Sequence, residues 1–513
     1  MADDVEPLIP LTDFERRIEK VRVRVGLVLA PIVFSVVLTA PISSLETKPE
    51  AHRLAAVLAA VVILWITEAL PLPVTALLGA SACTLLGVAS AKTIFSPFAD
   101  QLMFLFVGSF ILARAIFLHG LDRRLAFGVM SLAWVGGRPA RILFAYGAVT
   151  AFISAWISNT ATTAMMMAIG LSMIRFLFDP RQAGDLKINR AYATGMMLMT
   201  SFAASIGGLA TPIGTPPNVI GLSFIRKFLN VEISFFEWMI VGVPVVVILY
   251  LFLFVYLNWF CPAGVRELSG SRELLERNRD SLGPWTSGQI STLVAFLTTV
   301  ALWIAPGVVA LTAGEESRVY ILLRECCPEG VAALIGAVML FLLPGKSEGR
   351  AITWPEAVQI DWGVVLLYGG GFSLGELSRL TGLADAMGTG IAAWIPLHGE
   401  FGMLLASTIV AVLVSETTSN TASANIVVPL VISLAQAAGV DPLAPALGAT
   451  FGASLGFMLP VSTPCNAIVY GTGYIPLSRM IRYGLLLDVV GVAVIVTLIH
   501  WFVPVLESRH LTP

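Results

Sequence analysis

Apolar stretches long enough to cross a membrane constrain the fold of this chain more than any other feature. They lie at 25–43, 54–70, 74–90, 98–118, 142–178, 191–225, 236–260, 289–312, 330–343, 360–380, 400–437, 443–475 and 484–506. A helix needs about 20 apolar residues to cross a bilayer. Only 12% of the residues are charged, whereas soluble domains carry about 25%. The chain is therefore expected to be an all-α polytopic membrane protein.

Two of these stretches, 142–178 and 400–437, are too long for one crossing and have polar centres. The first contains Ser158–Thr160 and the second Ser419–Thr421, both with the sequence SNT. Each stretch is either two spanning helices or a hairpin that enters and leaves on the same side. A polar hairpin tip inside the membrane is tolerated only when it is buried in protein or lines a watery cavity.

The distribution of basic residues favours the hairpins. If the N-terminal segment is cytoplasmic and the other eleven stretches cross once, the cytoplasmic side holds 20 of the 31 Lys and Arg residues and the outside nine. This bias obeys the positive-inside rule. We therefore expect about eleven transmembrane helices plus two re-entrant hairpins in the cell membrane, with the N-terminus cytoplasmic and the C-terminus outside. The first hairpin would open from the cytoplasm and the second from outside.

An internal repeat relates the two halves. Three segments recur in the same order: GSF at 108–110 and GGF at 370–372, SAWISNTA at 154–161 and SETTSNTA at 415–422, and TPIGTPPNVI at 211–220 and LPVSTPCNAI at 459–468. Five crossings per half turn the second repeat upside down, which is the inverted-repeat plan of many secondary transporters. The expected segments are a cytoplasmic N-terminal segment (1–24), a first transmembrane half (25–260, repeat 1 about 51–260), a cytoplasmic linker (261–288), a second transmembrane half with repeat 2 (289–506) and a C-terminal tail (507–513).

The third repeated segment contains the residues that break helices. Proline removes a backbone donor and clashes with the preceding turn, so Pro212, Pro216 and Pro217 in the first copy, and Pro460 and Pro464 in the second, predict two helices broken at mid-depth. The freed carbonyls can bind a cation, and the amide groups at half-helix ends can hold an anion.

The SNT tips supply matching groups. Serine hydroxyls and the asparagine carboxamide oxygen suit Na⁺, and the asparagine amide and threonine hydroxyl can donate to a carboxylate. Two facing tips would bind the two ends of a dianion, each with a cation behind it. The alternative is that these residues only cap helices or join them; their duplication beside paired prolines favours a binding site.

Together with ITEALPLPVTALL at 66–78, these motifs resemble the divalent anion/sodium symporter family, which contains di- and tricarboxylate carriers and sulfate carriers. The resemblance covers roughly residues 25–506 and implies an elevator-type carrier, usually a homodimer, whose transport domain slides against a scaffold domain. It also implies at least two Na⁺ sites, the first made by Ser154, Ser158, Asn159 and the backbone of Gly214, and the second by Ser415, Ser419, Asn420 and the backbone of Ser462. The implied substrate contacts are Asn159, Thr160, Thr215, Asn420, Thr421, Thr463 and Pro464.

These observations predict a secondary active transporter that moves dicarboxylates of the succinate, malate or fumarate type with Na⁺. The alternatives are a carrier of sulfate or another divalent anion, or a Na⁺-independent dicarboxylate exchanger of the same fold. An enzyme is not expected, because no nucleophile–base pair or phosphate loop is present, and the five His and five Cys residues have no metal-ligand spacing. No basic run suggests nucleic acid. The role of Glu416, beside Ser415, stays open between tuning a cation or proton and pairing with a nearby base.

Overall fold

The computed structural model describes residues 13–42, 45, 47–178, 189–268, 270–345, 349–392 and 399–510, and this part of the chain contains helices and no β-strand. The helices of the first half are α1 (Asp13–Thr39), α2 (Pro49–Thr67), α3 (Leu72–Leu85), α4 (Ala91–Phe95), η2 (Ser96–Ala99), α5 (Gln101–His119), α6 (Leu121–Met130), α7 (Pro139–Ser154), α8 (Asn159–Phe178), α10 (Arg190–Gly207), α11 (Pro216–Leu229) and α12 (Phe235–Phe260). Those of the second half, including the linker, are α13 (Ser271–Asp280), α14 (Ser287–Ala313), α15 (Arg318–Cys326), α16 (Glu329–Leu342), α17 (Trp354–Ala357), α18 (Trp362–Leu380), α19 (Leu383–Ala392), α20 (Glu400–Thr417), α21 (Asn420–Ala437), α22 (Leu443–Gly452), α23 (Pro464–Tyr470) and α24 (Leu477–His510).

The protein is a multi-pass membrane protein by the length and apolarity of its helices. Within the described ranges nine helices are long and apolar enough to cross a membrane, and the bent pair α15–α16, with an angle of 68°, adds a tenth. The predicted eleven crossings included stretches that form only short helices here, such as α3 with 14 residues and α22 with 10 residues. These helices are shorter than the about 20 residues that a straight crossing needs. Their length alone therefore does not show whether they cross the membrane.

All four predicted interruptions are present. The stretch 142–178 forms α7 and α8 with a turn at 155–158, and 400–437 forms α20 and α21 with a break at 418–419. The proline-rich segments separate α10 from α11 and α22 from α23. Pro216 and Pro464 each occupy the first residue of the second half-helix, where a missing N–H costs no hydrogen bond.

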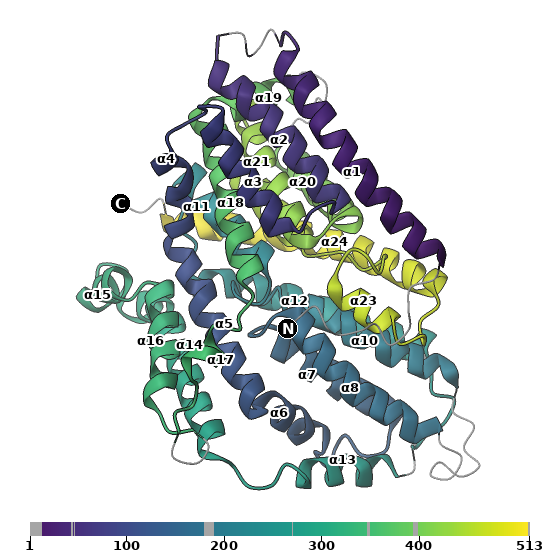
Figure 1. Ribbon diagram of the computed structural model, residues 1–513. Helices are drawn as coiled ribbons and strands as arrows, with labels where there is room; N and C mark the ends of the chain where they lie inside the picture. Colours follow the sequence, from purple (N-terminus) through teal and green to yellow (C-terminus); the bar gives the residue numbers. More distant parts are fainter. Residues whose placement is uncertain are drawn as a thin grey trace.

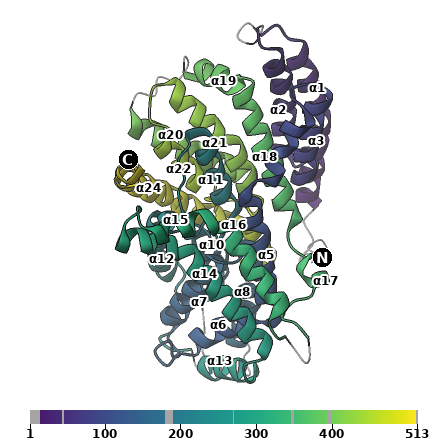
Figure 2. The same ribbon diagram turned by 90° about the vertical axis from the view of Figure 1, so that its left-hand side faces the viewer.

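The two helical hairpins lie toward opposite ends of the molecule. Figures 1 and 2 show α7 and α8 at the end where α6 and α13 lie, and α20 and α21 at the end where α19 lies. Each hairpin packs on the broken helix of its own half: α7 and α8 on α10, and α20 and α21 on α22. The halves also interlock, because α8 contacts α23 and α21 contacts α11.

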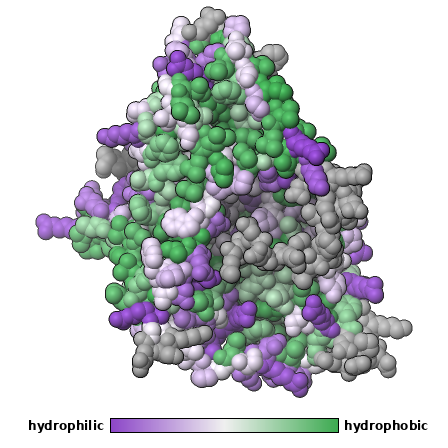
Figure 3. Space-filling view, in the orientation of Figure 1, coloured by the Kyte–Doolittle hydropathy of each residue, from purple (hydrophilic) through white to green (hydrophobic). Residues whose placement is uncertain are grey.

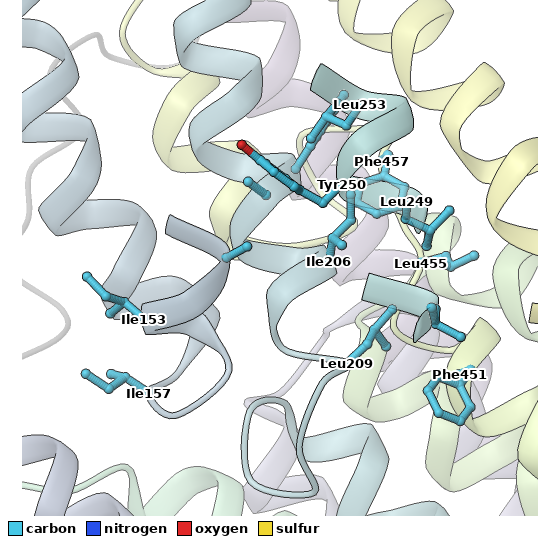
Figure 4. Packing of buried hydrophobic residues seen from close by; sticks show 14 of the residues in the cluster. Ile153, Ile157, Ile206, Leu209, Leu249, Tyr250, Leu253, Phe451, Leu455 and Phe457 are labelled. Carbon is cyan, nitrogen blue, oxygen red and sulfur yellow. The ribbon is translucent and has the colours of Figure 1, made fainter. Parts of the chain in front are cut away.

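A buried apolar core holds the two broken helices together. Phe202 of α10 meets Phe457 of the second broken segment with ring centroids 5.1 Å apart, and Trp238 of α12 stacks on Phe451 of α22 at 4.5 Å. Figure 4 shows Phe457 of the second broken segment beside Leu249 and Tyr250 of α12, with Ile206 of the first broken segment close by, and all four belong to one buried cluster. The core therefore fixes both segments relative to each other.

The surface has the polarity expected of a membrane protein. Figure 3 shows apolar side chains over much of one face and polar ones gathered along the edge where α6 and α13 lie. Helix α13 lies in the segment predicted to be a surface linker, and α1 begins inside the predicted N-terminal segment. Residues 1–12 of that segment and 511–513 of the predicted C-terminal tail lie outside the described residues.

Asp122, on α6 outside the spanning helices, predicts a pH-dependent stability. Burial raises the pKa of its carboxyl to about 6. The folded state then binds more protons than the unfolded state between about pH 4 and 6, so this group lowers stability as the pH rises through that window. Asp122→Asn is expected to raise the free energy of unfolding of the detergent-solubilised protein at pH 8 by up to about 2 kcal/mol, measured as a higher melting temperature, and to leave both nearly unchanged below about pH 4. An equal shift at both pH values would contradict this assignment.

Candidate functional site

The first hairpin tip forms an oxygen cluster with the first broken helix. Ser154, the last residue of α7, donates its hydroxyl to the Asn159 side chain at 2.6 Å and is 2.6 Å from the Ala204 carbonyl oxygen. The Asn159 amide points one terminal atom into the same cluster, 2.6 Å from Ser154 Oγ, 3.1 Å from the Ala204 carbonyl and 3.3 Å from that of Gly214. The hairpin turn and the break between α10 and α11 therefore build one site together.

The second tip repeats this arrangement. Ser415, near the end of α20, donates to Asn420 Oδ1 at 2.8 Å and is 2.8 Å from the Ala453 carbonyl oxygen. Asn420 Nδ2 donates to the Ser454 carbonyl at 3.2 Å. Ser462 joins the cluster from the far side of the break, and its hydroxyl donates to the Gly456 and Leu459 carbonyls at 2.8 and 2.7 Å. The repeat found in the sequence is thus a repeat of hydrogen-bond geometry.

In each cluster one serine hydroxyl lies between two oxygen acceptors. The single hydroxyl proton of Ser154 faces both the Asn159 side chain and the Ala204 carbonyl, and that of Ser415 faces two acceptors in the same way. The Asn159 amide has two orientations with opposite consequences: with its nitrogen inward it donates to Ser154 Oγ and to the Ala204 and Gly214 carbonyls, and with its oxygen inward it adds one more oxygen to the cluster. The second orientation is the one that suits a cation. A bound cation would balance such a shell, and neutral hard oxygens suit Na⁺ better than a transition metal. The described residues contain no group of three or more His, Cys, Asp or Glu side chains that could hold a metal ion.

Two asparagines that the sequence reasoning did not assign hold the broken segments in shape. Asn218 Nδ2 donates to the Gly208 and Thr211 carbonyls at 2.9 and 2.8 Å. Asn466 Nδ2 donates to the Gly456 and Leu459 carbonyls at 2.9 and 3.0 Å. Both end the repeated TPPN and TPCN motifs, so the repeat itself was the signal that would have identified them.

We expect Asn218→Ala to lower the stability of the protein by about 2–4 kcal/mol, because two buried carbonyls lose their donor. Asn218→Asp, which keeps the shape but replaces the donor with an acceptor, should cost at least as much. Melting temperatures of the purified protein in detergent would measure both, with Asn278→Ala in the surface helix α13 as the control. Wild-type stability of Asn218→Asp would contradict the positioning role.

Some of the other predicted site residues cap helices, and the rest make no capping bond or are exposed. Ser158 and Ser419 accept from the Ala161 and Ala422 amides at 3.4 and 3.2 Å, so they cap α8 and α21. Thr463 caps α23 in the same way, whereas Thr215, equally buried, makes no such bond. Exposure grows toward the tips, with Thr421 half-buried and Thr160 and Pro464 exposed.

The tips of one half meet the broken helix of the other. The Cys465 thiol, in the turn after Pro464, faces the hydroxyls of Thr160 and Thr163 of α8 and Ser205 of α10. Three other buried side-chain oxygens around these segments, those of Thr162, Asn218 (Oδ1) and Ser454, have no hydrogen-bond partner in the described part of the chain. Buried polar groups are rarely left unpaired, so these oxygens are candidates for contact with a polar ligand.

A cavity lies beside this region. It has a volume of about 530 Å³ and extends from Pro212 of the first broken segment to α5, α12, α14 and α15. The predicted site residues do not line it. A second cavity of about 410 Å³ is lined by charged residues, including the ion pairs Arg226–Asp100 and Lys227–Glu376.

Known proteins resemble this chain along nearly its whole length. The family model for the sodium:sulfate symporter transmembrane region matches residues 22–508. The sodium-dependent dicarboxylate transporter SdcS of Staphylococcus saprophyticus is 32% identical over 487 residues, which cover 94% of this chain and 91% of that protein. SdcS of Staphylococcus aureus strain USA300 is 30% identical over 493 residues, with the same coverage.

A solved structure agrees with the fold. The YdaH transporter of Alcanivorax borkumensis superposes with a TM-score of 0.54 over 95% of this chain and 98% of its own, at 12% identity, and at that identity only the fold is comparable. The names of the SdcS relatives and of the family model indicate a transporter rather than an enzyme. The family match and the resemblance of the paired motifs agree: the chain belongs to the divalent anion/sodium symporter family, whose members share the sodium:sulfate symporter transmembrane region.

Proposed function

We propose that this protein is a Na⁺-coupled secondary transporter of small dicarboxylates. The observation that carries this proposal is the pair of matching clusters, Ser154–Asn159–Ala204 and Ser415–Asn420–Ala453, in which a serine hydroxyl, an asparagine carboxamide and a backbone carbonyl meet in each half. Two such clusters on two facing repeats suit two cations and a substrate with two anionic ends. The names of the 30–32% identical relatives support the same ion and substrate class.

The roles of the site residues follow from their surroundings. Ser154, Asn159 and the Gly214 backbone would bind the first Na⁺, and Ser415, Asn420 and the backbone near Ser462 the second. Ser158 and Ser419 would support the tips as caps while presenting their remaining lone pair. Thr160, Thr215, Thr421, Thr463 and the ring of Pro464 would contact the carboxylates, with the N-terminal amides of α8 and α21 adding positive potential. Each cation would neutralise part of the substrate charge, so release of Na⁺ would release the substrate.

We propose that the protein moves its substrate by an elevator mechanism. Its two halves would form an inverted repeat, and two copies of the chain would form a homodimer. The hairpins pack directly on the broken helices, α7 and α8 on α10 and α20 and α21 on α22, which supports their movement as one body. The ion pair Arg226–Asp100 joins α11 to the N-cap of α5, and Lys227–Glu376 joins α11 to α18. Both would have to break when this body slides. We place the N-terminus in the cytoplasm and the C-terminus outside, because this orientation obeys the charge bias of the loops.

Uptake of radiolabelled succinate into proteoliposomes tests the proposal. We expect uptake against the succinate gradient when an inward Na⁺ gradient is imposed, and none when choline replaces Na⁺. Uptake that requires internal dicarboxylate but not Na⁺ would make the protein an exchanger. Sulfate uptake without succinate uptake would keep the fold and change the substrate.

A further inference from the structure

The cavity of about 530 Å³ beside the first broken helix has an apolar floor. Buried apolar side chains from three helices line it, namely those of Leu102 and Leu105 of α5, Leu222 of α11 and Trp303 of α14. A volume of this size is typical of sites that hold a small molecule. None of the predicted transport residues lines the cavity, so it is separate from the two Ser–Asn clusters.

The open side of the same cavity carries charges of both signs. Arg324, Glu325 and Glu315 line it and are exposed. Arg324 pairs with Glu232 at 2.8 Å, but both side chains are more than half exposed, and such surface pairs contribute little. Glu315 and Glu325 form no ion pair with any described residue. One guanidinium and two carboxylates are therefore available to a ligand.

Helix α15 places this open side at the edge of the membrane. It contains no buried residue and follows the candidate spanning helix α14, and Figure 1 shows it projecting beside α14 and α16. Tyr320 and Ile321 line the cavity, whereas Val319 and Leu322 do not and are 56% and 61% exposed. A short helix with one apolar and one polar face lies in the interface between lipid and water. The charged side of the cavity is then at the level of the lipid headgroups.

We propose that this cavity binds one phospholipid whose headgroup is zwitterionic and carries a primary ammonium, of the phosphoethanolamine type. Its phosphate would accept hydrogen bonds from Arg324, because a guanidinium matches phosphate geometry. Its ammonium would lie between Glu315 and Glu325, and one acyl chain would cover the apolar floor. A dicarboxylate would leave that floor bare, and an anionic headgroup would face the two carboxylates without a counter-charge.

A binding experiment tests this site without transport. A ligand that binds the folded state raises its melting temperature as its concentration rises. We would titrate the purified protein in lipid-free detergent with phosphatidylethanolamine, phosphatidylcholine and phosphatidylglycerol of equal chain length. Phosphatidylethanolamine should raise the melting temperature to a plateau, and phosphatidylglycerol should need at least about tenfold more lipid. Phosphatidylcholine, which has the charges but no N–H donors, should fall between them. Equal responses to all three lipids would overturn the proposal.

Two pairs of variants locate the site. Ala310 of α14 lines the cavity, whereas its neighbour Leu311 does not and is 57% exposed. Ala310→Trp fills the cavity and should lose the response to phosphatidylethanolamine, and Leu311→Trp should keep it. Glu325→Gln should raise the half-saturating lipid concentration about tenfold, because it removes a charged partner of the ammonium. Glu316→Gln, at an exposed carboxyl that does not line the cavity, should not.

Wild-type responses in Ala310→Trp and Glu325→Gln would overturn the assignment of the lipid to this cavity. If Ala310→Trp is not recovered in folded form, Glu325→Gln decides, because its side chain is exposed and the substitution leaves the core intact.

A transport experiment rests on the proposed function. Leu222 belongs to the proposed moving body, and Leu102 of α5 does not, so a lipid that contacts both would stabilise the described arrangement. Phosphatidylethanolamine added to phosphatidylglycerol proteoliposomes should slow dicarboxylate uptake by the wild type and Leu311→Trp, but not by Ala310→Trp. Equal slowing in all three would contradict this consequence. A wild type that moves no dicarboxylate would refute the proposed function and leave the binding experiment valid.

Discussion

Replacement of Asn159 or Asn420 by alanine is expected to lower Na⁺-dependent dicarboxylate uptake by at least about 100-fold. Each asparagine offers its carboxamide to a cluster of serine hydroxyl and backbone carbonyl, at 2.6 Å from Ser154 and 2.8 Å from Ser415. A hydrogen bond to a charged group is worth about 1.5–3 kcal/mol, and each asparagine would serve both a cation and a carboxylate. A loss of about 3 kcal/mol corresponds to roughly 100-fold in affinity.

The measurement is initial uptake in proteoliposomes at equal amounts of folded protein, judged by gel filtration. Asn278→Ala in α13 is the control and should transport like the wild type. Ser154→Ala and Ser415→Ala should raise the Na⁺ concentration that half-saturates uptake. Ser158→Ala and Ser419→Ala should mainly lower the stability of the protein, by about 1 kcal/mol each, because each removes a helix cap. Wild-type uptake in both asparagine variants would show that these clusters do not bind the ions.

Alanine at Gly208 is expected to be far more damaging than alanine at Gly456, although the two glycines occupy equivalent positions of the repeat. A Cβ at Gly208 would lie 2.4 Å from Asn159 Oδ1, whereas one at Gly456 would lie 3.2 Å from Asn420 Oδ1 and from Ser415 Oγ. The first distance forces the asparagine out of its cluster. The second requires a shift of a few tenths of an ångström. We therefore expect Gly208→Ala to abolish Na⁺-driven uptake and Gly456→Ala to reduce it less than about tenfold.

Uptake at several Na⁺ concentrations, with melting temperatures in parallel, separates a lost site from a lost fold. Gly208→Ala should lose the stabilisation that Na⁺ gives through the first cluster, and Gly456→Ala should keep that of both. Equal effects of the two substitutions would mean that the repeats are more alike than these distances indicate.

Much of this architecture was predictable because its signals are local. The apolar stretches and the charge bias gave the membrane class, and the prolines at 212, 216 and 464 gave the breaks, since a proline disrupts a helix wherever it stands. The repeated SNT tripeptides located both tips. The pairs Ser154–Asn159 and Ser415–Asn420 are five residues apart along the chain, so their meeting needs only the hairpin turn. The family resemblance assigned both pairs to cations.

The sequence alone determined that the chain is a membrane-embedded helical protein with two polar hairpins, two broken helices and a repeated set of Ser, Asn and Thr residues. Only the tertiary structure decided that Ser158 and Ser419 cap helices while Ser154 and Ser415 face backbone carbonyls, and that Asn218 and Asn466 hold the broken segments. It also brought the Glu416 carboxylate to the backbone amides of Met458 and Leu459, and the tip of α8 to Cys465. Local patterns fix where a helix begins or breaks, because those effects act within one turn of the chain. Which oxygen meets which donor depends on packing between helices that lie far apart in the sequence, and no local pattern encodes it.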